Sequence, residues 1–444
     1  MLARYADNVL ELSRRSFLAC ATLAPSVARA AAPFALTGDD DRFLDDLSRR
    51  AFRFFWEQAD PHTGLVLDRA SVDGLQVTHH SVDVASTAST GFALTACCIA
   101  SVRNWIDPNT ARERVRATLR HLAFEQVTQY GWYYHFVNRQ TGERVWRCEL
   151  STIDSALLLA GVLTAQQCFS GDAEIVRLAQ LIYERVNFGW MLDENTGFLR
   201  MGWKPETGFL PPQWVDYREN VILHILAMGS PTFGIPANTW FRFARDPIVF
   251  NGMGWGGRGP IFTHQFPQGY LDLSTLRDGE PYGINYFDNS VIATYAHREY
   301  CLSVRSFYPT YSENLWGVTP SDSSIGYVIW GGWDGRLRRD FDGTVVPCAA
   351  GGSLMFAPEI CLPALRAMQQ DFGDSTYGRY GFVDAFNPAS GWVNPEVVGI
   401  DLGITLVSAE NLRSRRVWNW FMQSAFIQRA IGQVFQTDQA RYQL

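Results

Sequence analysis

Charged residues are scarce in this sequence, and no basic run occurs in it. Asp, Glu, Lys and Arg make up 19% of the 444 residues, and the net charge is −7 at pH 7. Because nucleic acid is bound through clusters of Lys and Arg, we expect no nucleic-acid partner. Apolar residues make up 47%, so the low charge predicts a large folded core and not a disordered chain.

Several motifs that carry chemistry are also absent. There is no Cys-x-x-Cys pair, and the eight histidines have no metal-ligand spacing, so we expect neither a metal nor another cofactor. No Gly-x-Ser-x-Gly sequence is present, which leaves a serine nucleophile without support. The glycine-rich segment 252–259 does not end in the Lys-Ser/Thr of a phosphate loop. Beyond the N-terminus, no apolar run is long and charge-free enough to span a membrane.

The eight cysteines do not suggest a disulfide framework. Cys97 and Cys98 are adjacent and would bridge only with strain. Others, such as Cys168 and Cys361, lie in apolar runs, which predicts buried free thiols.

The N-terminus resembles a twin-arginine export signal. Ser13–Leu18 contains Arg14-Arg15, a short apolar stretch follows, and Ala28-Arg29-Ala30 forms a cleavage site. The alternative is a chance arginine pair on a disordered tail. We therefore predict that residues 1–30 are a signal peptide and that residues 31–444 are a single domain, exported to the periplasm or secreted.

The remaining chain predicts alternating buried and amphipathic helices. The expected helices cover residues 41–58, 85–102, 112–127, 151–169, 173–187, 215–228, 289–304, 358–370, 404–412 and 417–431. Aromatic stretches followed by Thr-Gly predict short hairpins at 55–64, 132–142 and 190–197. Residues 231–282 are rich in Gly, Pro and aromatics and predict a long irregular functional loop. The alternation suits a closed ring of helix pairs with hairpins on one face.

Acidic residues stand at the predicted starts of four helices: Asp154, Glu219, Asp288 and Asp401. For each one, helix capping or a favourable interaction with the helix dipole is the alternative. If the helices form a ring, however, their starts converge on one mouth, where paired carboxyls can hydrolyse a glycosidic bond. Partial burial can keep one of them protonated. Aromatics reach 14% with 15 Trp, which indicates either a heavy aromatic core or rings that stack on sugars.

Ordered motifs in the C-terminal half carry a family resemblance. They include residues 285–294, 313–322, 352–359, 380–387, 399–401 and 410–411, and the earlier segment 149–158 continues them. These motifs resemble the glucoamylase-like domain family, which includes glycoside hydrolase family 144. Leu402 departs from the family pattern, where Gln is usual, and Asp288 stands where Glu is common.

The resemblance implies an all-α (α/α)6 barrel with short β-hairpins and long irregular loops at its active-site face. It implies an inverting, metal-free hydrolase of a soluble β-glucan, most specifically β-1,2-glucan. Glu219 is the expected general acid and Asp154 the expected general base, with Asp401 as a further catalytic candidate. Other residues are expected to contact the oligo- or polysaccharide substrate: Asp288, Trp203, Trp214, Trp255, Arg258, His264, Trp316, Asp322 and Trp392. The alternatives are a non-catalytic glucan-binding or synthase-accessory protein and a hydrolase of a different glucan.

Overall fold

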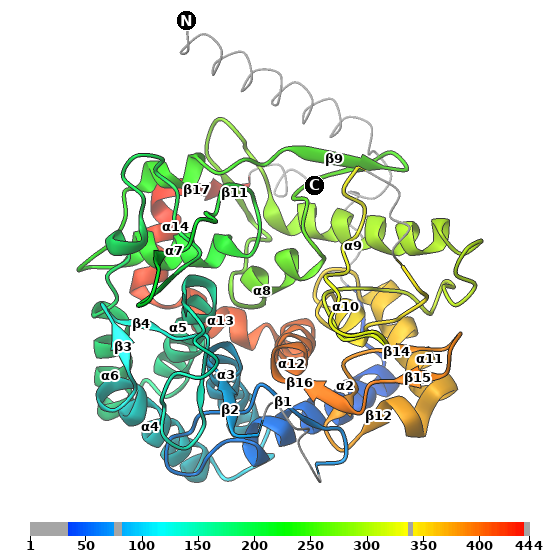
Figure 1. The fold of residues 1–444 in the computed structure, drawn as a ribbon, viewed down its shortest axis with the longest axis horizontal. Coiled ribbons are helices and arrows are strands. Elements are labelled where there is room, and N and C mark those ends of the chain that lie inside the picture. The colour runs from blue at the N-terminus through cyan, green and yellow to red at the C-terminus, as the bar shows by residue number, and fades with distance from the viewer. Residues whose placement is uncertain (1–33, 75–81, 336–340, 439–444) are drawn as a thin grey trace, which may run out of the picture.

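The computed structural model describes residues 34–74, 82–335 and 341–438 (Figure 1). The predicted signal peptide, residues 1–30, lies outside the described residues. The described chain is predominantly helical. Its helices are α2 (Gly38–Glu57), α3 (Thr87–Val102), α4 (Pro108–Phe124), α5 (Thr152–Cys168), α6 (Ala173–Glu184), α7 (Asn220–Gly229), α8 (Phe262–Tyr270), α9 (Tyr286–Ser303), α10 (Pro347–Gly351), α11 (Pro358–Thr376), α12 (Gly399–Ser414), α13 (Arg416–Met422) and α14 (Ala425–Val434).

The helices fall into two groups that differ in burial. Helices α3, α5, α7, α8, α10 and α12 are buried almost throughout. Helices α2, α4, α6 and α14 bury one stripe only, as α2 does with Phe43, Leu44 and Leu47. In Figure 1, α8 and α12 lie near the middle of the molecule, and α4, α6, α9 and α11 lie toward its rim. The predicted alternation of buried and amphipathic helices is confirmed for the N-terminal half, from α2 to α7.

The inner helices α3 and α5 pack with their backbones in contact. A Cβ atom added to Gly161 would lie 2.0 Å from the carbonyl oxygen of Gly91, and one added to Gly91 would lie 2.4 Å from that of Leu157. Both helices begin beside Tyr133 and Tyr134. At the start of α3 the Thr87 hydroxyl donates to the Tyr134 carbonyl, and at the start of α5 the Ser155 hydroxyl accepts from the Tyr133 N–H. The two helices therefore run side by side in the same direction.

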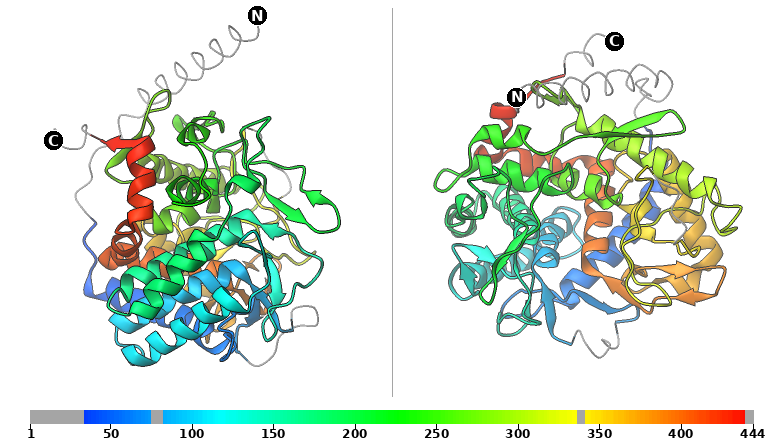
Figure 2. Two further views of the ribbon diagram at one scale, coloured as in Figure 1. Left: turned by 90° about the vertical axis from the view of Figure 1, so that its left-hand side faces the viewer. Right: turned by 45° about the horizontal axis from the view of Figure 1, so that its top comes forward.

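Short strands connect the helices, and most of them gather on one side of the molecule (Figure 2). They pair as β1 (Arg69–Ser71) with β16 (Glu396–Val398), β2 (Val84–Ser86) with β5 (Phe136–Asn138), β3 (Thr128–Gln129) with β4 (Trp132–Tyr133), β9 (Pro247–Phe250) with β10 (Met253–Gly256), β11 (Leu276–Asp278) with β17 (Phe435–Thr437), β12 (Tyr377–Gly378) with β13 (Gly381–Phe382), and β14 (Phe386–Asn387) with β15 (Trp392–Val393). Strands β6 (Leu150–Ser151), β7 (Gly202–Lys204) and β8 (Gly208–Phe209) form a three-stranded sheet.

The predicted Thr-Gly turns share one detailed geometry. In each, the side chain of an Asp or Asn accepts hydrogen bonds from the backbone N–H groups two and three residues later. The backbone carbonyl of the same residue accepts a hydrogen bond from the N–H of the glycine. The glycine has a positive φ near 71°, which an L residue rarely adopts. The turns span 60–64, 138–142 and 193–197, and residues 387–391 repeat them with serine in place of threonine. These four turns precede α3, α5, α7 and α12, respectively.

Several expected elements differ in the structure. The predicted helix 215–228 begins only at Asn220, as α7, which makes Glu219 its N-cap. The predicted loop 231–282 contains the buried helix α8 as well as β9 and β10. The predicted helix 417–431 is divided into α13 and α14, because Gln423 and Ser424 interrupt it. Helix α12 begins at Gly399, five residues before its predicted start, which brings Asp401 into its first turn. No helix in the described ranges is long and apolar enough to cross a bilayer.

Candidate active site

Asp154 lies in the first turn of α5, on the side where the short strands gather. The Ser151 hydroxyl donates to the Asp154 carboxylate, and the Asp154 N–H donates back to Ser151 Oγ at 3.3 Å. His135 Nε2 lies 3.5 Å from Asp154 Oδ1, and its Nδ1 lies 3.0 Å from Glu149 Oε1. Burial lowers the pKa of His135, but the carboxylates of Asp154 and Glu149 outweigh burial and raise the pKa to about 9. At neutral pH, Asp154 therefore faces an imidazolium ion.

Glu219 stands at the N-cap position of α7 and points its carboxyl group into the interior. Its Oε2 atom is buried and has no hydrogen-bond partner among the described residues. Burial raises the pKa of Glu219 to about 7, and the nearby Asp154 carboxylate adds to the increase. Glu219 can therefore hold a proton near neutral pH while its neighbour Asp154 is paired with a cation.

Asp401, in the first turn of α12, shares a hydrogen bond with Asp384 from the loop between β13 and β14. Burial, followed by the proximity of Asp384, raises the pKa of Asp401 well above its usual range. Burial also raises the pKa of Asp384, to about 6. A single proton held between the two carboxyls explains why both pKa values are raised. Asp401 is the partner that carries this proton. The buried Cys348 thiol adds a further hydrogen bond to Asp401.

Asp68 and Arg69 connect these two groups of acids. Burial raises the pKa of Asp68, which interacts with Asp154 on one side and with Asp401 on the other. Arg69 NH1 lies 2.8 Å from Asp322 Oδ2 and 3.2 Å from Glu396 Oε2. The Asp322 N–H in turn donates to Asp384 Oδ2 at 2.9 Å. We call Glu219, Asp154, Asp68, Asp401, Asp384 and Asp322 the acid row, because each interacts with the next.

A hairpin at residues 321–328 carries an aromatic ring beside the acid row. Ser321 and Val328 exchange backbone hydrogen bonds, and the Trp330 indole N–H donates to Ser321 Oγ. Tyr327 keeps 64% of its surface exposed. Burial of its hydroxyl, followed by the carboxylates of Asp401, Asp384 and Asp322, raises the pKa of Tyr327 to about 12. The Tyr327 hydroxyl thus lies close enough to these acids for their charges to act on it.

Two predicted sugar contacts, Trp203 and Trp214, lie around the start of α5. Trp203 is half-buried on β7, opposite Leu150 and against Trp190. The Trp214 indole N–H donates to Thr152 Oγ1 at 3.0 Å, and the ring is almost fully buried. Trp214 thus holds the first turn of α5 in place. Trp392, a third predicted contact, is half-buried on β15, and Asn394, directly after that strand, donates to Asp384 and Asp322.

Of four further predicted sugar contacts, three are buried and one is exposed. His264 and Trp316 are 1% and 0% exposed. Burial lowers the pKa of His264 to about 3, so its ring is neutral beside Ser290. Trp255 is buried in a separate small cluster with Ile248 and Ile261. Arg258 is exposed in the connection before α8.

The structure does not bring Asp288 to the acid row. Asp288 lies in the first turn of α9, whose neighbouring residue Phe287 packs on Trp418 of α13. Helix α13 directly follows the C-terminal end of α12, whereas Asp401 lies at the opposite end of α12. Helix α9 is half-buried and runs at the rim (Figure 1), and the contact with Trp418 places its first turn near the end of α12 and not near its start.

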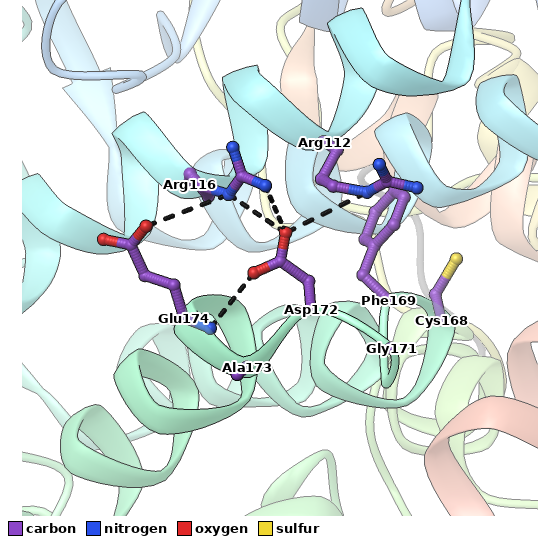
Figure 3. A pocket seen from close by; sticks show the side chains of 8 residues that line it. All are labelled: Arg112, Arg116, Cys168, Phe169, Gly171, Asp172, Ala173 and Glu174. Carbon is purple, nitrogen blue, oxygen red and sulfur yellow. Dashed lines mark hydrogen bonds and ion pairs between the residues drawn. The ribbon is translucent and has the colours of Figure 1, made fainter.

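A separate cavity of about 570 Å³ lies between α4 and α6 (Figure 3). Asp172, at its edge, caps α6 and pairs with Arg116, while Cys168 and Phe169 line the other end. None of the acid row lines this cavity. The described residues also contain no group of three or more His, Cys, Asp and Glu side chains arranged to hold a metal.

The site includes residues that the sequence did not single out: His135, Glu149, Asp68, Arg69 and Asp384. Glu149 and Asp384 lie inside the motifs that carry the family resemblance. Their position in these motifs could have indicated that they belong to the site. His135, Asp68 and Arg69 lie in or beside strands of three residues or fewer, where no periodicity indicates their direction.

Comparisons with known proteins find similar sequences and structures. Residues 211–425 match the family Glycoamylase, described as Putative glucoamylase. A curated relative from Parabacteroides distasonis, an exo β-1,2-glucooligosaccharide sophorohydrolase acting at the non-reducing end, is 26% identical over 89% of this chain. The chain spans 58% of that relative's length.

Solved structures extend the similarity to the whole fold. An endo-β-1,2-glucanase from Chitinophaga pinensis, in complex with sophorotriose and glucose, has a TM-score of 0.83 and 26% identity and covers 91% of this chain and 99% of its own. A β-1,2-glucanase from Parabacteroides distasonis, at 24% identity and a TM-score of 0.80, shares the fold over 91% of this chain and 61% of its own. The resemblance predicted from the sequence motifs is thereby confirmed: residues 211–425 match the Glycoamylase family model, and the whole chain shares its fold with solved β-1,2-glucanases.

Proposed function

We propose that this chain is a glycoside hydrolase that cleaves β-1,2-glucan with inversion, using Glu219 as general acid and Asp154 as general base. One observation carries the proposal. Glu219 has a buried carboxyl oxygen without a protein partner and a pKa near 7, and it stands beside Asp154. A buried carboxyl with a free oxygen can donate its proton to the oxygen atom of a leaving sugar. The choice of the β-1,2 linkage is supported by the similarity to a β-1,2-glucanase and to a β-1,2-glucooligosaccharide sophorohydrolase.

The chemistry follows from the different charges of the two acids. Glu219 protonates the glycosidic oxygen as the bond to the anomeric carbon breaks. Asp154 accepts a proton from a water molecule, which attacks the opposite face of that carbon. Ser151 and His135 hold the Asp154 carboxylate in one orientation before the water loses its proton. Asp401 is less suited to be the base, because its raised pKa keeps it protonated in the free protein.

The proposed barrel explains why these acids meet. Helices α3, α5, α7, α8, α10 and α12 would be the inner helices of an (α/α)6 barrel, with the amphipathic helices outside. Asp154, Glu219 and Asp401 all stand at the starts of inner helices. Inner helices run in the same direction in such a barrel, so their first turns share one mouth. Trp203, Trp392 and Tyr327 would border the sugar there. Export by the twin-arginine route would place the enzyme outside the cytoplasm, where soluble glucans occur.

The first test is product analysis with linear β-1,2-glucan and the chain without its predicted signal peptide, residues 31–444. We expect short β-1,2-linked products, with the newly formed anomer inverted when it is followed by NMR. Glu219→Gln should lower the rate of their formation about 10²–10⁴-fold. Glu194→Gln, an exposed acid in the turn 193–197, is the matched control and should keep full activity.

Three outcomes would overturn parts of the proposal. Products from another glucan but none from β-1,2-glucan would retain the hydrolase and reject the linkage. Glucan binding without any product would favour a binding protein. Retention of the anomeric configuration would reject the roles given to Glu219 and Asp154.

A further inference from the structure

We infer that Cys98 of α3 and Cys168 of α5 form a reversible disulfide that joins the two inner helices. This modification site is separate from the acid row and does not depend on the proposed function. All cysteines of the described chain are free thiols in this structure, and all but Cys168 are buried. The inference therefore concerns what these two thiols do when an oxidant is present.

The packing of α3 on α5 places the two thiols together. The helices touch at Gly91 and Gly161, where added Cβ atoms would lie between 2.0 and 2.8 Å from backbone atoms of the other helix. Cys98 follows Gly91 by seven residues, and Cys168 follows Gly161 by seven. Seven residues make about two helical turns, which returns a side chain to the same face. Because the helices run in the same direction, both cysteines lie on the shared face.

The structure records the resulting contact. The Cys168 thiol lies near enough to Cys98 to add to the rise that burial causes in the pKa of the Cys98 thiol. Cys97, one residue earlier, shows only a charge interaction with Cys168. Disulfides require Cα atoms about 4.4–6.8 Å apart, a separation that two helices in backbone contact can supply. Cys98 is therefore the expected partner of Cys168.

A soluble oxidant can reach Cys168 through the cavity between α4 and α6. Cys168 is only half-buried and lines this cavity, which has a volume of about 570 Å³ (Figure 3). Cys98 is 0% exposed and lies behind it. A soluble disulfide can therefore reach Cys168 first, while Cys98 reacts only within the protein.

The reaction balances with a small-molecule disulfide such as oxidised glutathione as oxidant. The Cys168 thiolate attacks one glutathione sulfur, forms a mixed disulfide and releases one glutathione thiolate. The Cys98 thiolate then attacks Cys168 Sγ and releases the second. The two cysteine protons end on the two glutathione thiols, so two protein thiols are oxidised and one glutathione disulfide is reduced. Burial raises the pKa of Cys98 well above its usual range, which makes the second step slow.

The test is mass spectrometry of the full-length chain after incubation with oxidised or reduced glutathione. Trypsin releases residues 70–103 with Cys97 and Cys98, and residues 148–177 with Cys148 and Cys168. We expect these peptides to be linked, with the loss of two hydrogens, only after oxidation. Cys98→Ser and Cys168→Ser should abolish the link, whereas Cys97→Ser and Cys148→Ser, the matched controls, should retain it.

A second measurement asks whether the link joins the helices. The disulfide closes a long loop, so the oxidised wild-type chain should unfold about 3–8 °C above the reduced chain. Cys168→Ser should show no such difference. A glutathione adduct that persists on Cys168 without the link, or a link through Cys97 or Cys148, would overturn the inference. No glucan enters either measurement, so failure here leaves the proposed hydrolase untouched.

Discussion

Burial sets the charge of Glu219 and hence the pH range in which it can act. Its pKa of about 7 means that the proton needed by a general acid is lost above neutral pH. We predict that kcat/KM on β-1,2-glucan falls about tenfold per pH unit above pH 7. Glu219→Gln should lower kcat about 10²–10⁴-fold. Initial rates between pH 5 and 9 test both, and a rate that stays constant to pH 9 would contradict the role.

The same group affects stability, with a sign that follows from its raised pKa. The unfolded carboxyl ionises near 4.5, whereas the folded one ionises near 7. The stability contributed by this group is therefore complete below pH 4.5 and is lost as the pH rises through 7. Glu219→Gln should match wild type at pH 4 and exceed it by about 3 kcal/mol at pH 8. Thermal unfolding at both pH values measures this, and a variant less stable than wild type at pH 8 would contradict it.

Tyr327 tests whether the hairpin 321–328 borders the substrate. If its ring stacks on a sugar, Tyr327→Ala should raise KM about tenfold with little change in kcat. Tyr327→Phe should differ little from wild type, because it keeps the ring. Ile325→Ala at the hairpin tip, where Ile325 is 87% exposed, is the control. An equal effect of the Ile325 variant would show that only the hairpin's stability matters.

At the residue scale, the sequence predicted the acids that stand at helix starts. Asp154 and Glu219 could be found because the apolar residues that follow each acid mark a helix and its first turn. Asp68 and Asp384 could not be found in this way. They lie in irregular connections, where only the folded structure decides which way a side chain points.

At the scale of elements, the contact between α3 and α5 depends on two residues without side chains. A methyl group at Gly161 would overlap the carbonyl of Gly91, whose atoms are backbone and cannot rotate away. We predict that Gly161→Ala lowers the free energy of unfolding by at least about 2 kcal/mol, despite the better helix propensity of alanine. Gly171→Ala, where an added Cβ meets nothing within 4 Å, should change it by less than about 0.5 kcal/mol. Denaturant melts of both variants compare them, and equal stabilities would contradict the close packing.

The helices that were predicted well are those with a clear apolar stripe or a long apolar run. Helix α8 was missed because Phe262–Tyr270 contains Pro267 and Gly269, which disfavour a helix. It forms because every side chain from Thr263 to Tyr270 is buried, and tertiary packing outweighs propensity. That burial comes from distant parts of the chain, so local sequence could not reveal it.

At the scale of the whole molecule, Arg69 joins the first strand to the last part of the chain. Its guanidinium contacts Asp68, Asp322 and Glu396, and all four side chains are largely buried. Arg69→Met would leave three acids without their cation, and we predict a loss of about 2–4 kcal/mol at pH 7. The loss should shrink at pH 4, because burial raises the pKa of Asp68 and favours its protonated form there.

Arg120→Met is the control for the Arg69 variant. Arg120 pairs with Glu174 on the surface, where the two side chains are 54% and 32% exposed, and such a pair contributes about 0–1 kcal/mol. Thermal unfolding of both variants at pH 7 and pH 4 distinguishes the stability lost from a buried ion-pair network from the stability lost from a surface ion pair. Similar losses for the two variants would contradict the proposed role of Arg69.

The pairing of β1 with β16 also determines how late during synthesis the fold can be completed. Arg69 and Glu396 are 327 residues apart, and a ribosome adding about 5–20 residues per second needs on the order of 20–60 s to cover that distance. Throughout that interval the partners of β1 do not yet exist, and the flank of α3 that α12 later covers stays open to water and to other nascent chains. The acid row can therefore assemble only after Asp401 has been synthesised, and until then the protection of the unfinished fold is a task for chaperones.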